Sequence, residues 1–264
     1  MKKVLSIATS DSGAGAGIQA DLKAFLRCGV YGTTAIVATT AQNTVGVSGI
    51  HALPPEVAVE QIEAVAEDIG VDAVKTGMLF NAEIISAVAE TVQRLKLPNL
   101  VIDPVMVAES GAVLLESDAI ETYKTELFPL AAAITPNFNE AFALLGETPD
   151  EDHVEDCAVT LHALGPAAVV ITGGHTASGA DLLYDGSGFT KIEGPIHAKN
   201  AAHGSGCTHS SSLASFLALG FGVEGAARRA RAVASEAVEY GLEEIGAGAG
   251  PVHALGKILK GVGK

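Results

Sequence analysis

The stretch His203-Gly-Ser-Gly-Cys-Thr-His-Ser-Ser-Ser-Leu-Ala-Ser-Phe-Leu-Ala-Leu219 decides how the rest of the chain is interpreted. Its apolar residues Leu213, Phe216 and Leu217 recur at i, i+3 and i+4, which predicts a buried helix. A glycine loop precedes that helix directly. The first N–H groups of a helix lack internal partners and the helix dipole is positive there, so such a loop can bind an anion. A packed glycine loop before a core helix explains the same residues equally well.

The charge and the cysteine content restrict the class of protein. The chain has 264 residues, with 31 acidic and 16 basic side chains and a net charge of −15. This excess argues against nucleic acid or an anionic membrane as a partner, because both bind basic patches. The N-terminal apolar run ends at Ser10, too early for a signal peptide. Cys28, Cys157 and Cys207 form no CxxC pair, which favours a reducing compartment and no structural zinc. We therefore expect a cytoplasmic protein.

Apolar runs of strand length alternate with amphipathic runs of helix length along the chain. We expect strands at 4–9, 33–40, 72–76, 100–103, 132–135 and 167–172, and a hairpin at 182–191. We expect helices at 18–28, 54–68, 82–95, 117–127, 152–164, 203–219 and 223–244, and one that follows Asn137 and ends at Leu145. This alternation predicts an α/β fold whose mostly parallel sheet is covered on both faces. Without an internal repeat or linker, we expect one domain over 1–264, with a flexible glycine hinge and a short C-terminal helix over 246–264.

The residues that follow the predicted strands should share one rim, because ligands of such folds bind outside the carboxyl ends of the strands. These residues are Asp11–Gly17, Gln42-Asn43, Gly77-Met78, Asp103-Pro104, Pro136-Asn137 and Gly173-Gly174. The glycines of 13–17 do not have the GxGxxG spacing, and no acidic residue ends the second strand, so a dinucleotide site is disfavoured. The chain also contains no GxxxxGK[ST] phosphate loop.

Two small clusters have competing interpretations. His203, Cys207 and His209 could be metal ligands or a thiol–imidazole pair, but one tight loop is unlikely to supply ligand geometry. The start of a helix predicts a lowered pKa for the Cys207 thiol. Asn137 and Glu140, at i and i+3, could face a hydrated Mg²⁺ ion or could form a capping box.

Several motifs occur together in one order and at matching spacing from about residue 4 to 220. They are Ser6–Lys23, Ala41–Thr44, Lys75–Leu79, Asp103–Val107, Thr135–Asn137 with Glu140, Gly173–His175 and His203–Thr208. In this combination the chain resembles the hydroxymethylpyrimidine/phosphomethylpyrimidine kinases of thiamin biosynthesis. The resemblance implies a ribokinase-like three-layer α/β/α sandwich, usually a homodimer, that binds ATP with Mg²⁺ and a small aminopyrimidine.

The resemblance also implies roles for individual residues. Gln42 would hydrogen-bond the aminopyrimidine, Met78 and Val105 would pack near its ring, and Asp11 and Gly17 would shape the pocket. Phosphoryl transfer would involve the loop Gly204–Gly206, with Cys207 as the base that faces the substrate hydroxymethyl group. The Mg²⁺–phosphate and nucleotide end would be served by Asn137, Glu140, Thr172, Gly174 and Ser205, with Glu140 binding Mg²⁺ through water. Asp21 is interpreted as a structural helix residue rather than a ligand.

The sequence departs from the family's usual pattern where phosphates are expected. Thr172 stands where a lysine is usual, and Glu109 where lysine or threonine is usual. Lys75 and Lys199 are candidate replacements. The leading hypothesis is an ATP-dependent kinase of 4-amino-5-hydroxymethyl-2-methylpyrimidine and its monophosphate. The alternatives are a pyridoxal or pyridoxine kinase, and a non-catalytic pyrimidine sensor.

Overall fold

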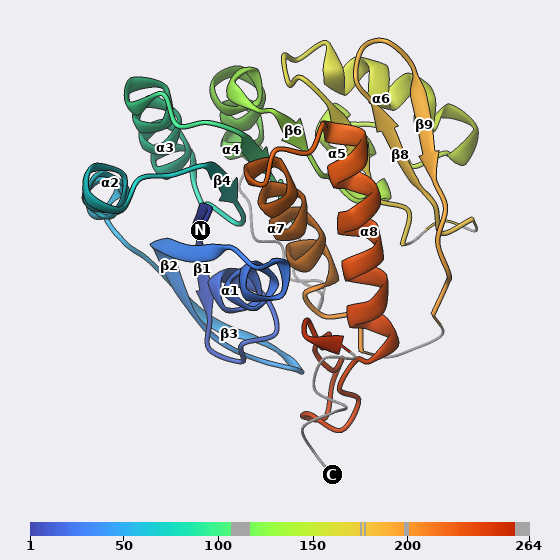
Figure 1. The fold of residues 1–264 in the computed structure, drawn as a ribbon, viewed down its shortest axis with the longest axis horizontal. Coiled ribbons are helices and arrows are strands. Elements are labelled where there is room, and N and C mark those ends of the chain that lie inside the picture. The colour runs from blue at the N-terminus through green and yellow to red at the C-terminus, as the bar shows by residue number, and fades with distance from the viewer. Residues whose placement is uncertain (107–116, 175, 177, 198–200, 257–264) are drawn as a thin grey trace.

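A single sheet forms the middle layer of the protein (Figure 1). The computed structural model describes residues 1–106, 117–174, 176, 178–197 and 201–256. In these residues the sheet has nine strands in the order β3-β2-β1-β4-β5-β6-β7-β8-β9. The strands are β1 Lys3–Asp11, β2 Tyr31–Asn43, β3 Gly46–Ala52, β4 Ala73–Thr76, β5 Leu100–Ile102, β6 Ala133–Ile134, β7 Val169–Ile171, β8 Asp181–Tyr184 and β9 Phe189–Ile192. Strands β2, β1, β4, β5, β6 and β7 are parallel, whereas β3, β8 and β9 are antiparallel to their neighbours.

Helices cover both faces of this sheet, as the alternation of elements predicts. They are α1 Gly17–Cys28, α2 Pro55–Ala64, α3 Ala82–Leu95, α4 Ser117–Thr122, α5 Phe138–Leu145, α6 Val154–His162, α7 Ser205–Ala218 and α8 Val223–Glu239. π-Helical turns, Val65–Ile69 and Tyr123–Leu127, continue α2 and α4, and 3₁₀ turns lie at Phe128–Leu130 and Glu151–His153. The predicted α/β/α sandwich with a mostly parallel sheet is confirmed.

Neighbouring strand residues belong to two different cores. Val4 packs with α1, α7 and α8, while the next residue, Leu5, packs with α2, α3 and the elements that follow. Likewise, Val101 belongs to the same core as Val4, and Ile102 to the same core as Leu5. Successive strand side chains point to opposite faces, so a strand buried on both faces has to be apolar at every position. The two cores fix the strands and, with them, the positions of the loops at their carboxyl ends.

One strand of the structure lies outside the prediction, and one predicted helix is too long. The strand β3 was not predicted, because none of its residues is buried and its sequence therefore lacks an apolar pattern. The predicted helix 223–244 is too long: α8 ends at Glu239. Gly241 lies against Ala201, where a Cβ atom would meet the Ala201 backbone, so the chain has already turned away from the helix.

The segment after α8 contacts the start of α7. His203 N donates to Gly250 O at 3.3 Å, and Val252 N donates to His203 O at 3.0 Å. Gly248 N also donates to Thr44 Oγ1 at 3.2 Å. These bonds hold residues of the expected hinge beside the glycine loop, while most of the expected C-terminal helix, 257–264, lies outside the described residues. Within the described part of the chain, no helix is both long and apolar enough to span a bilayer.

Candidate active site

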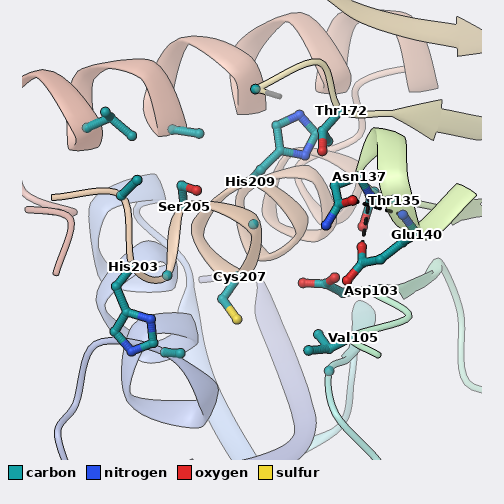
Figure 2. Close-up of a pocket in the computed structure, with 18 of the residues that line it drawn as sticks. Asp103, Val105, Thr135, Asn137, Glu140, Thr172, His203, Ser205, Cys207 and His209 are labelled. Carbon is teal, nitrogen blue, oxygen red and sulfur yellow. Dashed lines mark hydrogen bonds between the residues drawn. The ribbon is translucent and has the colours of Figure 1, made fainter. Parts of the chain in front are cut away.

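A pocket of about 300 Å³ lies at the carboxyl ends of the strands. Its lining includes every residue that the sequence assigns to a substrate, phosphoryl, nucleotide or metal site: Asp11, Gly17, Gln42, Met78, Val105, Asn137, Glu140, Thr172, Gly174, Gly204, Ser205, Gly206 and Cys207. Figure 2 shows part of this lining, with the turn before α7 between His203 on one side and Asp103 and Glu140 on the other. The structure brings these residues together, and their individual roles stay predictions.

The Asp11 carboxylate organises the loop between β1 and α1. It accepts hydrogen bonds from the N–H groups of Gly13, Gly15 and Ala16 at 2.8–3.0 Å, and His203 Nε2 lies 3.3 Å from its Oδ2. Burial by itself raises the pKa of Asp11, but the bonds from His203 and the backbone N–H groups outweigh it and hold the pKa below its usual value. A Cβ atom on Gly15 would overlap the His203 ring. Asp11 therefore joins the β1–α1 loop to the start of α7.

Gln42 and Met78 line the end of the pocket near β1 and β2. Thr40 Oγ1 donates to Gln42 Oε1 at 3.0 Å, which orients the Gln42 amide and turns its nitrogen to other acceptors. Thr9 Oγ1 donates to the Met78 carbonyl at 3.0 Å and fixes the backbone of that residue. Together with Val105 these side chains offer one oriented amide and two apolar groups, which suit a flat nitrogen heterocycle.

The turn that starts α7 has the features of an anion site. Gly204 is the N-cap with φ of 85°, no side chain caps the helix, and the first turn carries no acidic residue. A Cβ atom on Gly204 would collide with the Gly15 carbonyl, whereas one on Gly206 would meet no atom within 4 Å. Ser205 N donates to Ala202 O at 3.0 Å, so the N–H groups of Gly206 and Cys207 are those of the first turn that have no backbone partner among the described residues, at the positive end of the helix dipole.

Gly206→Ala is expected to leave the fold intact and to lower turnover by about 10²-fold, because the new methyl group enters the space that a phosphoryl group needs and displaces it by about 1 Å. Steady-state kinetics and the melting temperature measure both effects. Gly225→Ala is the matched control: it also adds a methyl group to a helix, in α8, and should leave kinetics unchanged. Unchanged turnover in Gly206→Ala would mean that no phosphoryl group approaches this turn.

The Cys207 thiol lies at the centre of the pocket, between His203 and Asp103 (Figure 2). The expected lowering of its pKa is wrong. Burial raises the pKa of Cys207 to about 12; Lys75 lowers it, but Asp103 and Asp21 raise it further. The favourable effect of a helix start is therefore smaller than desolvation beside two carboxylates, and the thiol is protonated at neutral pH.

Lys75 and Asp21 form an ion pair that is fully buried under the pocket. Lys75 Nζ lies 2.9 Å from Asp21 Oδ1, and Ser6 and Ser211 donate to the same carboxylate at 2.6 and 2.7 Å. Burial lowers the pKa of Lys75, but Asp21, Cys207 and Asp103 raise it above its usual value, so the ammonium stays charged. Asp21 is structural, as expected. The Lys75 ammonium is paired with Asp21 and is therefore not available to replace a phosphate-binding lysine.

Asp103 and Glu140 form a pair of carboxyl groups at the pocket floor (Figure 2). Burial, followed by the neighbouring Asp103 charge, raises the pKa of Glu140 to about 8. Burial also raises the pKa of Asp103, against the opposing effects of Lys75 and Ser210. Asn137 and Glu140 form the capping box, with bonds of 2.9 Å in each direction. Both also line the pocket, and their role toward Mg²⁺ stays a prediction.

The residues present fit a hydrated Mg²⁺ ion. Mg²⁺ is usually bound by one or two carboxylates together with substrate phosphates and water. Asp103 and Glu140 supply two carboxyl groups; burial raises the pKa of both, and the Asp103 charge raises that of Glu140 further. No larger group of three or more metal-binding side chains occurs among the described residues. His203, Cys207 and His209, which are all described, do not form such a group.

The far end of the pocket lies at β7 and β8. Thr172 follows β7, and its backbone bonds Pro136 and Phe138, which places it beside Asn137. Asp181, His209 and Arg231 line this end and were missed as a cluster, because they lie on three separate elements and no sequence spacing connects them. Glu109, Lys199 and His175, which the sequence placed near phosphates or in a motif, lie outside the described residues.

Comparisons with known proteins agree with this geometry. The family model described as phosphomethylpyrimidine kinase matches residues 11–253. A hydroxymethylpyrimidine/phosphomethylpyrimidine kinase of Bacillus subtilis is 45% identical over 255 residues, which cover 95% of this chain and 94% of the relative. The thiamine biosynthesis bifunctional protein ThiED of Geobacter sulfurreducens is also 45% identical, over 253 residues that cover 95% of this chain and 51% of the relative. The chain thus spans about half the length of that bifunctional protein.

A solved structure extends the likeness to the fold. The ADP complex of Bacillus subtilis pyridoxal kinase superposes with a TM-score of 0.91 at 36% identity, covering 98% of this chain and 99% of that one. The predicted ribokinase-like architecture is confirmed by this agreement.

Proposed function

Because the chain belongs to the phosphomethylpyrimidine kinase family, we propose that its pocket transfers the γ-phosphoryl group of ATP to 4-amino-5-hydroxymethyl-2-methylpyrimidine and to its monophosphate, as a step of thiamine biosynthesis. One observation carries the proposal: the uncapped start of α7 lies between an amide-bearing apolar end and a carboxylate-bearing end of one pocket. Such an arrangement suits a heterocycle and a nucleotide that meet at an anion site.

Each group has a task in the proposed transfer. Gln42 hydrogen-bonds the aminopyrimidine, and Met78 and Val105 pack against its ring, in a pocket end shaped by Asp11 and Gly17. The loop Gly204–Gly206 binds the phosphoryl group during transfer, when its charge is spread over three oxygens. Cys207 faces the substrate hydroxyl, and the small fraction in the thiolate form removes the hydroxyl proton.

The remaining residues serve the nucleotide. Asn137, Thr172, Gly174 and Ser205 line the pocket where they would contact its phosphates, and Glu140 together with Asp103 would hold a hydrated Mg²⁺ ion. When bound, Mg²⁺ neutralises phosphate charge. The ADP bound by the pyridoxal kinase of similar structure supports a nucleotide in this fold.

ATP consumption measured with the pyrimidine and with its monophosphate tests the proposal. Turnover with both is expected, and no turnover with either at millimolar substrate would overturn the kinase assignment. Calorimetry identifies the sensor alternative, which would bind the pyrimidine tightly and show no binding of ATP with Mg²⁺.

Pyridoxal is the second candidate substrate, because the solved structure with the TM-score of 0.91 is a pyridoxal kinase. The two heterocycles should be compared by kcat/KM, since specificity is a ratio of those constants. We expect the higher value with the pyrimidine. A higher value with pyridoxal would reassign the substrate and leave the nucleotide site unchanged.

Glu140→Gln is expected to raise the Mg²⁺ concentration needed for half-maximal turnover and to remove its pH dependence. With a pKa of about 8, roughly a tenth of Glu140 is ionised at pH 7, so the wild-type protein should need less Mg²⁺ as the pH rises from 7 to 9. Glutamine at this position retains the capping box. The exposed Glu147→Gln, just beyond α5, is the control.

The same pKa has a consequence for folding. A carboxyl whose pKa is raised in the folded state stabilises the fold while both states are protonated, and the contribution is lost as the pH rises through about 8. The melting temperature of Glu140→Gln should therefore fall less than that of the wild type between pH 5 and pH 9. An equal Mg²⁺ requirement at pH 7 and pH 9 in the wild type would contradict both expectations.

We also propose a single domain, a homodimeric assembly and a cytoplasmic location. Leu22, Leu26 and Tyr31 expose apolar surface on α1 and at the start of β2, where a second copy could bind. The described cysteines form no disulfide, which fits a reducing compartment. Sedimentation equilibrium measures the assembly, and a monomer would contradict it.

A further inference from the structure

His209 is a buried imidazole with one ring nitrogen, Nδ1, that has no partner within the described residues. It lies in the second turn of α7, is 4% exposed and lines the pocket. Its Nε2 lies 3.2 Å from Asp181 Oδ2, whereas Nδ1 makes no hydrogen bond to another described residue. Figure 2 shows the ring beside Thr172 and Asn137, away from His203. Buried polar atoms are nearly always paired, so this ring indicates a ligand that supplies the partner.

Asp181 fixes the position of this imidazole. Its Oδ2 lies 3.2 Å from His209 Nε2, and its Oδ1 accepts from Gly173 N at 3.0 Å. Arg231 Nε lies 3.9 Å from the same Oδ1, and Arg231 Nη2 donates to Gly179 O at 2.6 Å. One carboxylate therefore connects the turn after β7, the helix α7 and the helix α8, so that Nε2 faces Asp181 and Nδ1 remains for another partner.

The place of His209 in the fold indicates which ligand it meets. The amide-bearing end of the pocket lies at β1 and β2, whereas Asp181 and Thr172 lie at β8 and β7, on the other side of the sheet centre. The start of α7 lies between these ends. Lys75, the buried cation of the pocket centre, is paired with Asp21. A polyanion at the β7–β8 end would meet the His209 imidazole and the Arg231 guanidinium, which both line the pocket beside Asp181.

We propose that His209, oriented by Asp181, is a nucleotide-binding residue that donates a hydrogen bond from Nδ1 to the polyphosphate of ATP, with Arg231 adding positive charge. The imidazolium form has N–H groups on both nitrogens, one for the Asp181 carboxylate and one for a phosphate oxygen. With these two groups near the phosphates, position 172 does not need the lysine charge that is usual there. This inference rests on the proposed kinase function. It identifies the residues that supply positive charge at the nucleotide end of the pocket.

Three variants of His209 test the assignment by steady-state kinetics, with ATP and the hydroxymethylpyrimidine varied separately. His209→Phe keeps a ring without donors and should raise the KM for ATP by about 10-fold or more, while the KM for the pyrimidine changes less than about 2-fold. His209→Asn places an amide nitrogen near the position of Nδ1 and should recover most of the affinity for ATP. His209→Gln reaches toward Asp181 instead and should recover less.

Ser212→Ala is the matched control, because Ser212 is also buried on α7 but does not line the pocket; it should leave both KM values unchanged. If His209→Phe does not fold, the difference in the KM for ATP between His209→Asn and His209→Gln decides whether the assignment holds. An unchanged KM for ATP in His209→Phe, an equal rise of both KM values, or equal effects of Asn and Gln would overturn the assignment. Absent turnover in the wild-type protein would overturn the kinase function instead, so the two failures are distinguishable.

Discussion

Cys207→Ala is expected to lower turnover by about 10³-fold, or roughly 4 kcal/mol of transition-state stabilisation, while binding of the pyrimidine stays within about 3-fold. The thiol lies at the pocket centre beside the start of α7, where the acceptor hydroxyl would meet the phosphoryl group in the proposed transfer. Removal of its sulfur removes the proton acceptor without filling the space. Steady-state kinetics and calorimetry measure the two quantities separately.

The raised pKa of Cys207 adds a pH test to this prediction. Because the pKa is about 12, the thiolate fraction grows about tenfold per pH unit below that value. The kcat/KM of the wild type should therefore still rise between pH 9 and pH 10, above the titration of Glu140, and that of Cys207→Ala should not. Cys157→Ala, in the buried face of α6, is the control and should retain full turnover. Turnover of Cys207→Ala within about 3-fold of the wild type would remove this thiol from the mechanism.

Lys75→Met is expected to destabilise the protein by about 3–5 kcal/mol, the largest effect on stability that the structure predicts. Lys75 and Asp21 are both fully buried, and the ammonium lies 2.9 Å from one carboxylate oxygen and 3.1 Å from the other. Methionine has a similar length but leaves Asp21 as an uncompensated buried charge, with only Ser6 and Ser211 as donors. Chemical denaturation measures the free energy of unfolding.

The double variant Lys75→Met/Asp21→Asn provides the control, because it removes both charges. It should be more stable than Lys75→Met alone, and its effect should fall short of the sum of Lys75→Met and Asp21→Asn by about 1 kcal/mol or more, the coupling expected of residues in direct contact. Additive effects would show that the pair contributes no specific interaction. Arg94→Met, which breaks the exposed pair with Glu63, should cost less than about 1 kcal/mol.

The sequence predicts the central elements of the fold well and its margins less well. The helix at 82–95 is found with the same bounds, because Asn81 caps it and its apolar positions form one buried face. The strand β3 could not be predicted, since it is held by main-chain bonds to β2 and buries no side chain. A local sequence pattern reveals an element only when the element buries one of its faces, and β3 has no buried face.

The features of the site also divide into those that the sequence predicts and those that depend on tertiary structure. Residues such as Gln42 and Gly206 were identified because strand ends and glycine loops mark a rim in the sequence, and the pocket contains them. The pKa of Cys207 was predicted with the wrong sign, because the sequence shows the start of a helix but not the buried Asp21 and Asp103 charges beside the sulfur. The contact of His209 with Asp181 depends on tertiary structure alone.

The pairing of residues 250–252 with His203 has a consequence for the order of assembly during synthesis. His203 carries the turn before α7, and its main-chain partners are Gly250 and Val252. On a ribosome these partners emerge some 50 residues after His203, long after the strands that form most of the pocket. A nascent chain can therefore build the strands of the sheet first, and the turn before α7 gains its main-chain partners only after residue 252 has emerged.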